Sequence, residues 1–210
     1  MSETNALLAE LRVLPVVTAL DVPSTLKLAA ALQRGGMRAI EVTLRTPAAL
    51  DSIRALKDAG SSLQIAAGTI TDSGGMERAL AAGADFLVSP GSTQALLQDA
   101  REGGALLIPG VSSASDVMLG LSEGYRCFKL FPAAAVGGLA LLKSLAGPFP
   151  EVTFCPTGGL GPDNYLDYLA LPNVLCCGGS WMCATALVEN GDWQTIESLA
   201  QAAMQAVKED

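Results

Sequence analysis

The chain has 210 residues, half of them hydrophobic and 16% charged, which suits one folded domain and excludes a disordered chain. Its formal net charge of −8 disfavours nucleic-acid binding, because an acidic surface repels phosphodiester backbones. It contains no histidine, which excludes Ser-His-Asp and Cys-His catalysis and histidine-based zinc sites, and leaves carboxylates, lysine, arginine, hydroxyls, thiols or backbone amides for any chemistry.

Short apolar runs rich in β-branched residues alternate along the chain with longer segments of helical period. After a short helix at 4–12, the pattern predicts eight strands, at 14–20, 38–44, 63–67, 85–88, 105–108, 126–131, 151–156 and 173–177. The helices between them are predicted at 23–34, 47–58, 76–82, 93–101, 115–123, 139–145 and 162–169, and a closing amphipathic helix at 193–209. Because no linker or repeat divides the chain, we expect one domain over residues 1–210.

Alternation of strands and helices at this pitch predicts an α/β fold with a parallel sheet. Eight such units in this length favour a single (β/α)₈ TIM barrel preceded by a short N-terminal helix. The alternative is an open doubly wound sheet, but residues 20–23 after the first strand lack the glycines of a dinucleotide fingerprint. Predicted helices are preceded by Asp21, by Thr46, by the segment 71–73 (Thr-Asp-Ser) and by the segment 112–115 (Ser-Ser-Ala-Ser), where a Ser, Thr or Asp side chain can cap the helix start.

Two predicted strands place polar side chains on the face that would point into the barrel. In the second strand Glu41, Thr43 and Arg45 alternate with apolar residues, and in the sixth strand Lys129 lies among apolar neighbours. A lysine in such a run can snorkel at a strand end or form a buried ion pair with Glu41. A buried amine is also favoured in its neutral form, which attacks ketones to give a Schiff base. With an inward carboxylate as proton shuttle, imine chemistry is the favoured interpretation.

Glycine pairs follow the last two predicted strands, at 158–159 and 178–179, the second being followed by Ser180. Loops in these positions bind phosphate in many barrels, because glycines let backbone N–H groups approach the oxygens. Neutral amides can hold an anion despite the negative net charge of the chain. The alternative is that the glycines merely permit tight turns.

Five cysteines show no C-x-x-C pair, and most lie in apolar runs, so we expect buried reduced thiols and no metal site. No uninterrupted apolar run is long enough to span a membrane. The amino-terminal residues do not form a signal peptide, so we expect a cytoplasmic location.

Six motifs in register resemble the class I 2-keto-3-deoxy-6-phosphogluconate (KDPG) aldolases, also called KDPG/KHG aldolases. The resemblance spans residues 13–193 and is carried by Glu41-Val-Thr-Leu-Arg45-Thr, Ala67-Gly-Thr69, Ser89-Pro90-Gly91, Phe128-Lys129-Leu-Phe131-Pro-Ala, Phe154-Cys-Pro-Thr157-Gly158-Gly159 and Cys177-Gly-Gly-Ser180-Trp. It implies a homotrimeric barrel that cleaves a small phosphorylated keto acid, KDPG, to pyruvate and glyceraldehyde 3-phosphate in the Entner–Doudoroff pathway. A second implied substrate is 4-hydroxy-2-oxoglutarate, which would give pyruvate and glyoxylate.

The same resemblance assigns roles to individual residues and implies no cofactor or metal. Lys129 would be the Schiff-base lysine, and Glu41 the general acid/base. The expected substrate-binding residues are Arg45 and Thr69 for the carboxylate, Pro90 and Phe131 as pocket walls, Thr157 on the substrate, and Gly158, Gly159 and Ser180 for the phosphate.

Three other functions fit the same residues. A sister aldolase acting on the galactonate epimer would share Lys129 and Glu41. A phosphosugar isomerase or epimerase would use Glu41 as an enediolate base and Lys129 as an electrostatic clamp. A phosphosugar-binding barrel without catalysis is disfavoured by the intact acid–lysine pair.

Overall fold

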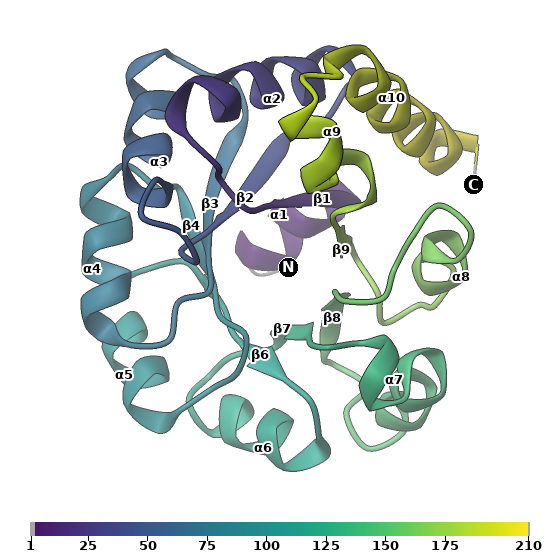
Figure 1. Cartoon of the computed structure of the whole chain (residues 1–210). Coiled ribbons are helices and arrows are strands. Elements are labelled where there is room, and N and C mark those ends of the chain that lie inside the picture. Colours follow the sequence, from purple (N-terminus) through teal and green to yellow (C-terminus); the bar gives the residue numbers. More distant parts are fainter. Residues whose placement is uncertain (1–2, 210) are drawn as a thin grey trace.

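The computed structural model describes residues 3–209; residues 1, 2 and 210 of the predicted domain lie outside that part. Helices surround a curled group of parallel strands, and the first helix lies behind the strands (Figure 1). The strands are β1 (Val13–Val17), β2 (Ala39–Thr43), β3 (Gln64–Gly68), β4 (Phe86–Val88), β5 (Leu107–Ile108), β6 (Gly110–Val111), β7 (Cys127–Leu130), β8 (Thr153–Pro156) and β9 (Cys177–Gly179). This confirms the predicted α/β class with parallel strands.

The helices follow the predicted order, with short additions near the carboxyl end. They are α1 (Glu3–Leu11), α2 (Val22–Arg34), α3 (Ala49–Asp58), α4 (Ser73–Ala81), α5 (Gln94–Glu102), α6 (Ala114–Ser122), α7 (Gly138–Ala146), α8 (Tyr165–Leu169), α9 (Thr185–Glu189) and α10 (Trp193–Glu209), with 3₁₀ turns η1 (Ala134–Val136) and η2 (Trp181–Cys183). Among residues 3–209, none of these helices has both the length and the apolar character needed to cross a membrane.

The strands form two parallel sheets in the order β5-β4-β3-β2-β1-β9 and β6-β7-β8. One chain segment links them, because β5 continues into β6 across Pro109. At the other side isolated parallel bridges join Phe154 to Val174 and Thr157 to Gly178. The predicted fifth strand, 105–108, is shorter in the structure, and β6 was not predicted. Pro109 separates β5 from β6, since proline has no N–H for the ladder and the Gly110 N–H donates to the Ser89 hydroxyl instead.

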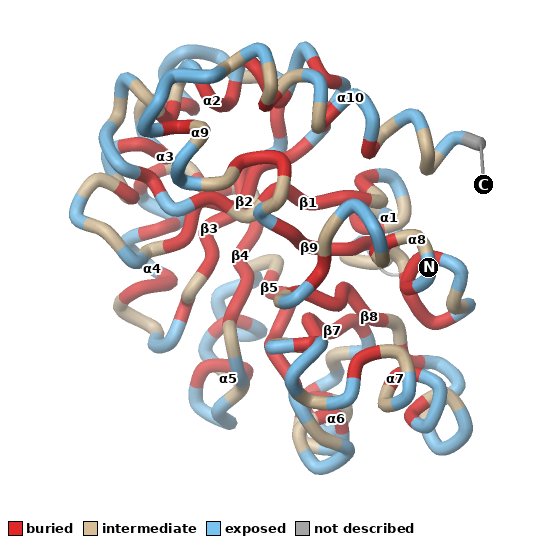
Figure 2. The backbone as a smooth tube through the Cα atoms, turned by 45° about the vertical axis from the view of Figure 1, so that its right-hand side comes forward, coloured by how far each residue is buried: buried red, intermediate tan, exposed pale blue. Residues whose placement is uncertain are grey.

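Two apolar clusters are buried on opposite faces of the strands. The larger lies between strands and helices and contains Val42, Phe128 and Phe154. The smaller contains Ala66, Cys127 and other inward residues together with Leu8 and Leu11 of α1. Figure 2 shows the resulting pattern, with buried backbone in the central strands and exposed backbone on the outer helices. Helix α1 thus closes the amino-terminal end of the strands, which leaves the carboxyl end for a site.

Two sequence predictions about strand and helix ends were wrong. The last strand is not at 173–177, because Cys177–Gly179 itself pairs with β1 and the second glycine pair is part of that strand. Thr46 does not cap α3, whose first turn has no side-chain cap; its hydroxyl donates to the carbonyl of Ala19 at 2.7 Å. The cap predicted at Asp21 is confirmed, and within the segments 71–73 and 112–115 the capping residues are Asp72 and Ser113. Each of these side chains accepts a hydrogen bond from a first-turn N–H.

All five cysteines are free and buried, as predicted. Burial raises the pKa of both the Cys127 and the Cys183 thiol to about 12. Such thiols are protonated near neutral pH, so they act as small apolar side chains in the core.

Candidate active site

Lys129 and Glu41 meet on the inner face of the curled parallel sheets. Lys129 is on β7 and Glu41 on β2, and the alternation of each strand turns both side chains inward. The Lys129 Nζ donates to Glu41 Oε1 at 3.0 Å and lies 3.4 Å from Oε2. The two side chains are 5% and 1% exposed. The predicted alternative of a buried ion pair between Lys129 and Glu41 is therefore confirmed, and the alternative that Lys129 snorkels to solvent is wrong.

The amine also borders a cavity of about 170 Å³ at the carboxyl end of the strands. Arg45, Phe131 and Thr157 line the same cavity, and the Lys129 Nζ lies 5.4 Å from the centroid of the Phe131 ring. Glu41 is placed behind the amine, outside the cavity wall. A small molecule in this cavity could thus reach the Lys129 nitrogen, with the carboxylate within one water of the reacting atoms.

Arg45 lines this cavity, and Thr69, which is not in the cavity wall, lies against Arg45. The Arg45 Nε donates to the Thr69 hydroxyl at 3.2 Å. Thr69 has φ of 64°, in the left-handed region that a β-branched residue rarely adopts. Strain of this kind persists where surrounding structure enforces it, and it is common at functional sites. The hydrogen bond holds the Arg45 guanidinium at the cavity wall. A guanidinium can bind a carboxylate through two hydrogen bonds.

Glycine-rich backbone forms the opposite wall. Gly158, Gly159, Gly179 and Ser180 line the cavity. Gly158 and Gly159 have φ of 98° and 79°, so this turn requires glycine. Both glycine pairs were predicted to lie near the site. Gly158, Gly159 and Gly179 do line the cavity, whereas Gly178 does not, and the second pair belongs to β9. Ser180 precedes the 3₁₀ turn η2 and is exposed.

Two other residues that the sequence singled out, Pro90 and Thr43, do not line the cavity. Pro90 is not in the cavity wall; its backbone packs against Gly110, the register partner of Lys129. Thr43, predicted to point inward, uses its hydroxyl to donate to the Val17 carbonyl at 2.9 Å. Two apolar wall residues, Val16 and Leu160, were not predicted, because an isolated apolar residue in a strand or loop gives no chemical signal.

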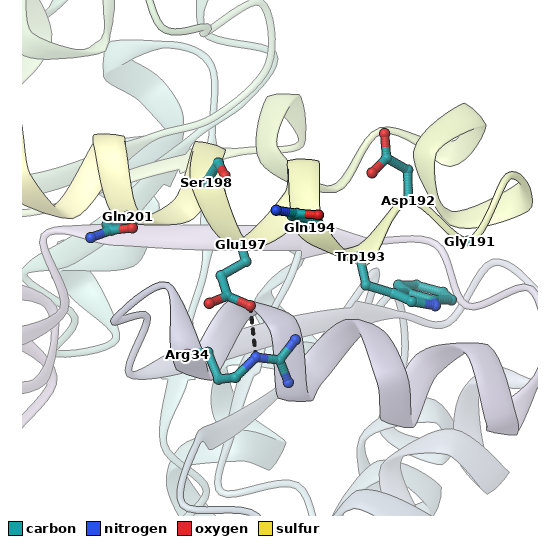
Figure 3. Close-up of a pocket in the computed structure, with 8 residues that line it drawn as sticks. All are labelled: Arg34, Gly191, Asp192, Trp193, Gln194, Glu197, Ser198 and Gln201. Atoms are coloured by element: carbon teal, nitrogen blue, oxygen red, sulfur yellow. Dashed lines mark hydrogen bonds and ion pairs between the residues drawn. The ribbon is translucent and has the colours of Figure 1, made fainter.

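A larger hollow of about 640 Å³ lies on the outer surface between α2 and α10 (Figure 3). It is an open groove whose charged pair, Arg34 and Glu197, has side chains 54% and 35% exposed. Exposed ion pairs contribute little and are solvated. Because the buried acid–amine pair is elsewhere, the smaller cavity is the candidate active site.

Comparison with known proteins shows the family of this chain. A family model described as KDPG and KHG aldolase matches residues 4–199. The chain belongs to the KDPG and KHG aldolase family. The 2-dehydro-3-deoxy-phosphogluconate aldolase of Pseudoalteromonas atlantica is 50% identical over 192 residues, which cover 91% of this chain and 89% of that protein. The resemblance noted from the motifs is thereby confirmed, and the chain is an aldolase, that is, a lyase.

Solved structures in the KDPG and KHG aldolase family share the fold closely. The Legionella pneumophila KDPG aldolase, with pyruvate captured as a covalent carbinolamine intermediate, has a TM-score of 0.93 at 44% identity, covering 96% of this chain and 98% of that one. The Zymomonas mobilis ZM4 enzyme with 3-phosphoglycerate has a TM-score of 0.90 at 41% identity, covering 96% and 94%. At 44% and 41% identity, the similarity of these two enzymes to this chain extends beyond the fold.

Proposed function

We propose that the chain is a class I aldolase that cleaves KDPG to pyruvate and glyceraldehyde 3-phosphate. The observation that carries the proposal is the buried contact between Lys129 Nζ and Glu41 Oε1 at the edge of the cavity. An amine in this position can attack the C2 ketone, while the carboxylate accepts and returns protons. Family membership supports the same reaction, as does the pyruvate adduct named for the Legionella enzyme.

The cleavage reaction requires no reagent besides the substrate and water. Lys129 Nζ adds to C2, and loss of water leaves a protonated imine. Glu41 removes the proton of the C4 hydroxyl, the C3–C4 bond breaks, and its electron pair delocalises into the imine as an enamine. The aldehyde leaves, C3 takes up a proton, and water hydrolyses the imine to release pyruvate and regenerate the amine. A positioned acid/base such as Glu41 contributes about 10²–10⁴-fold to this rate.

The remaining cavity residues hold the two charged ends of the substrate. We infer that Arg45 and Thr69 bind the carboxylate and that Gly158, Gly159 and Ser180 bind the phosphate. Phe131 would cover the imine, Thr157 would contact the substrate, and Pro90 would act through the strand beside Lys129. Backbone amides at glycines can approach phosphate oxygens closely, which offsets the repulsion from a chain of net charge −8.

We propose that the two sheets close into one (β/α)₈ barrel, with β5 and β6 as one strand and the β8–β9 bridges as the closing contact. We also propose that residues 1–210 form one domain. The homotrimer and the cytoplasmic location stay predictions from the family resemblance and the amino-terminal sequence.

The direct test is turnover of KDPG by the purified chain in the presence of EDTA. We expect pyruvate and glyceraldehyde 3-phosphate in equal amounts, with chelator causing no loss of rate, because Lys129 supplies the electron sink. Parallel reactions with the galactonate epimer and with 4-hydroxy-2-oxoglutarate define the preferred substrate. Isomerised phosphosugar without pyruvate, or inactivation by EDTA, would overturn the proposal.

Ser180→Ala tests the phosphate assignment. Hydrogen bonds to charged groups contribute about 1.5–3 kcal/mol, so we expect KM for KDPG to rise roughly 10–100-fold. KM for the unphosphorylated 4-hydroxy-2-oxoglutarate should stay within about twofold, and Ser144→Ala on the exposed face of α7 is the control. Equal losses on both substrates would show that Ser180 does not bind phosphate.

A further inference from the structure

Gly68, at the end of β3, lies directly against the catalytic carboxylate. A Cβ built on Gly68 would overlap Glu41 Oε1 and would lie 2.8 Å from both Cγ and Cδ of that side chain. Real Cβ atoms do not approach other heavy atoms this closely. The glycine therefore leaves a recess in the inner face of β3, and the Glu41 carboxylate occupies it.

The conformation of the backbone does not explain this glycine. Gly68 is absent from the positive-φ glycines of the described chain, so an alanine could adopt its φ without strain. The left-handed residue is its neighbour Thr69, which carries a side chain. Space for the Glu41 side chain is thus the structural reason for glycine at position 68.

The backbone around Gly68 has little freedom to retreat from an added methyl group. Gly68 is the register partner of Thr43 on β2, and its carbonyl accepts from the Leu44 N–H at 2.9 Å. Glu41 is equally confined, at 1% exposed and bonded to Lys129. An added Cβ must therefore displace the carboxylate from its place beside the amine.

Resting on the proposed function, we propose that Gly68 is a positioning residue, whose missing side chain sets where the Glu41 carboxylate stands relative to Lys129 Nζ. Proton transfer depends steeply on such placement, and an error of about 1 Å can cost about 10²-fold. The recess acts on the proton-transfer steps. Of the groups proposed to hold the substrate, Thr69 follows Gly68 directly, whereas Arg45 and the phosphate-binding residues lie on other segments.

The test is Gly68→Ala in two backgrounds, the unmodified chain and Glu41→Asp. In the unmodified chain we expect kcat to fall about 10²-fold while KM for KDPG changes less than about threefold. In the Glu41→Asp background the shorter side chain leaves the recess empty, so the added methyl group should cost less than about threefold in kcat. Gly68→Ala should lower the midpoint of urea denaturation in the unmodified chain and leave it constant in the Glu41→Asp background. This comparison of stabilities tests the same coupling between Gly68 and Glu41 if turnover of the double variant is too slow to measure. Gly147→Ala, at an exposed helix end, is the control.

The outcomes separate this inference from the proposed function. Borohydride trapping of pyruvate on Lys129 should persist in Gly68→Ala, because the amine is untouched. Equal losses of kcat in both backgrounds, or no loss in either, would overturn the role of Gly68. Failure of the unmodified chain to trap pyruvate would instead overturn the proposed function.

Discussion

Lys129→Met is expected to reduce turnover of KDPG by at least about 10⁴-fold, on the scale seen when a covalent nucleophile is removed. Methionine keeps the length of the side chain and removes the amine, so no imine can form. Lys129→Arg should be equally inactive, since a guanidinium stays protonated and is no nucleophile. Turnover and pyruvate trapping measured on the same samples check both variants; near-normal turnover in either would contradict the imine mechanism.

The same variants should differ in stability, which separates charge from chemistry. Lys129→Met leaves the Glu41 carboxylate buried without its cation, and breaking a buried pair in this way costs about 3–5 kcal/mol of the free energy of unfolding. The double variant Lys129→Met/Glu41→Gln removes both charges and should recover most of that loss in urea denaturation. Lys129→Arg keeps the charge and should be destabilised less than Lys129→Met. If the double variant is no more stable than Lys129→Met, the unpaired charge is not the cause.

Glu41→Gln is expected to lower kcat by about 10²–10⁴-fold while leaving the Schiff-base lysine in place. Glutamine fills the same recess at Gly68 and still accepts a hydrogen bond from Lys129, but it cannot take a proton from the C4 hydroxyl. Borohydride with pyruvate should therefore still modify Lys129, at a lower rate. Kinetics with KDPG and trapping with pyruvate, run in parallel, check this separation.

Two outcomes would contradict the assignment of Glu41. Unchanged kcat would mean that another group moves the proton, and complete loss of trapping would mean that Glu41 serves mainly to hold the amine. Glu123→Gln is the matched control, because Glu123 is another buried glutamate in an ion pair, with Arg101, and it lies at the carboxyl end of α6 and not in the cavity wall.

The sequence predicted that Glu41 and Lys129 point to the same interior, because period-two alternation is robust in strands buried on both faces. Val42 and Phe128 pack toward the helices, which leaves Glu41 and Lys129 on the other face of their strands. The glycine pairs at 158–159 and 178–179 also contribute Gly158, Gly159 and Gly179 to the lining of the cavity. The direction of a strand side chain and the position of a glycine pair both depend on neighbouring residues in the chain, so they can be predicted from the sequence.

What the sequence did not reveal depends on contacts between distant segments. The split at Pro109, the strand formed by Cys177–Gly179 and the use of Thr46 to bind Ala19 each require a partner strand or loop. The recess at Gly68 is of the same kind, because only the position of Glu41 on the neighbouring strand shows why a side chain is excluded there. Local propensity cannot report such fits.

The central claim is a covalent bond between one lysine and an α-keto acid, and borohydride reduction with pyruvate tests it most directly. The chain has five lysines, of which Lys27, Lys57, Lys143 and Lys208 are exposed and Lys129 is buried at the cavity. Peptide mass mapping should find one reduced pyruvyl group, on the peptide that contains Lys129. No adduct, or an adduct on an exposed lysine instead, would contradict the account.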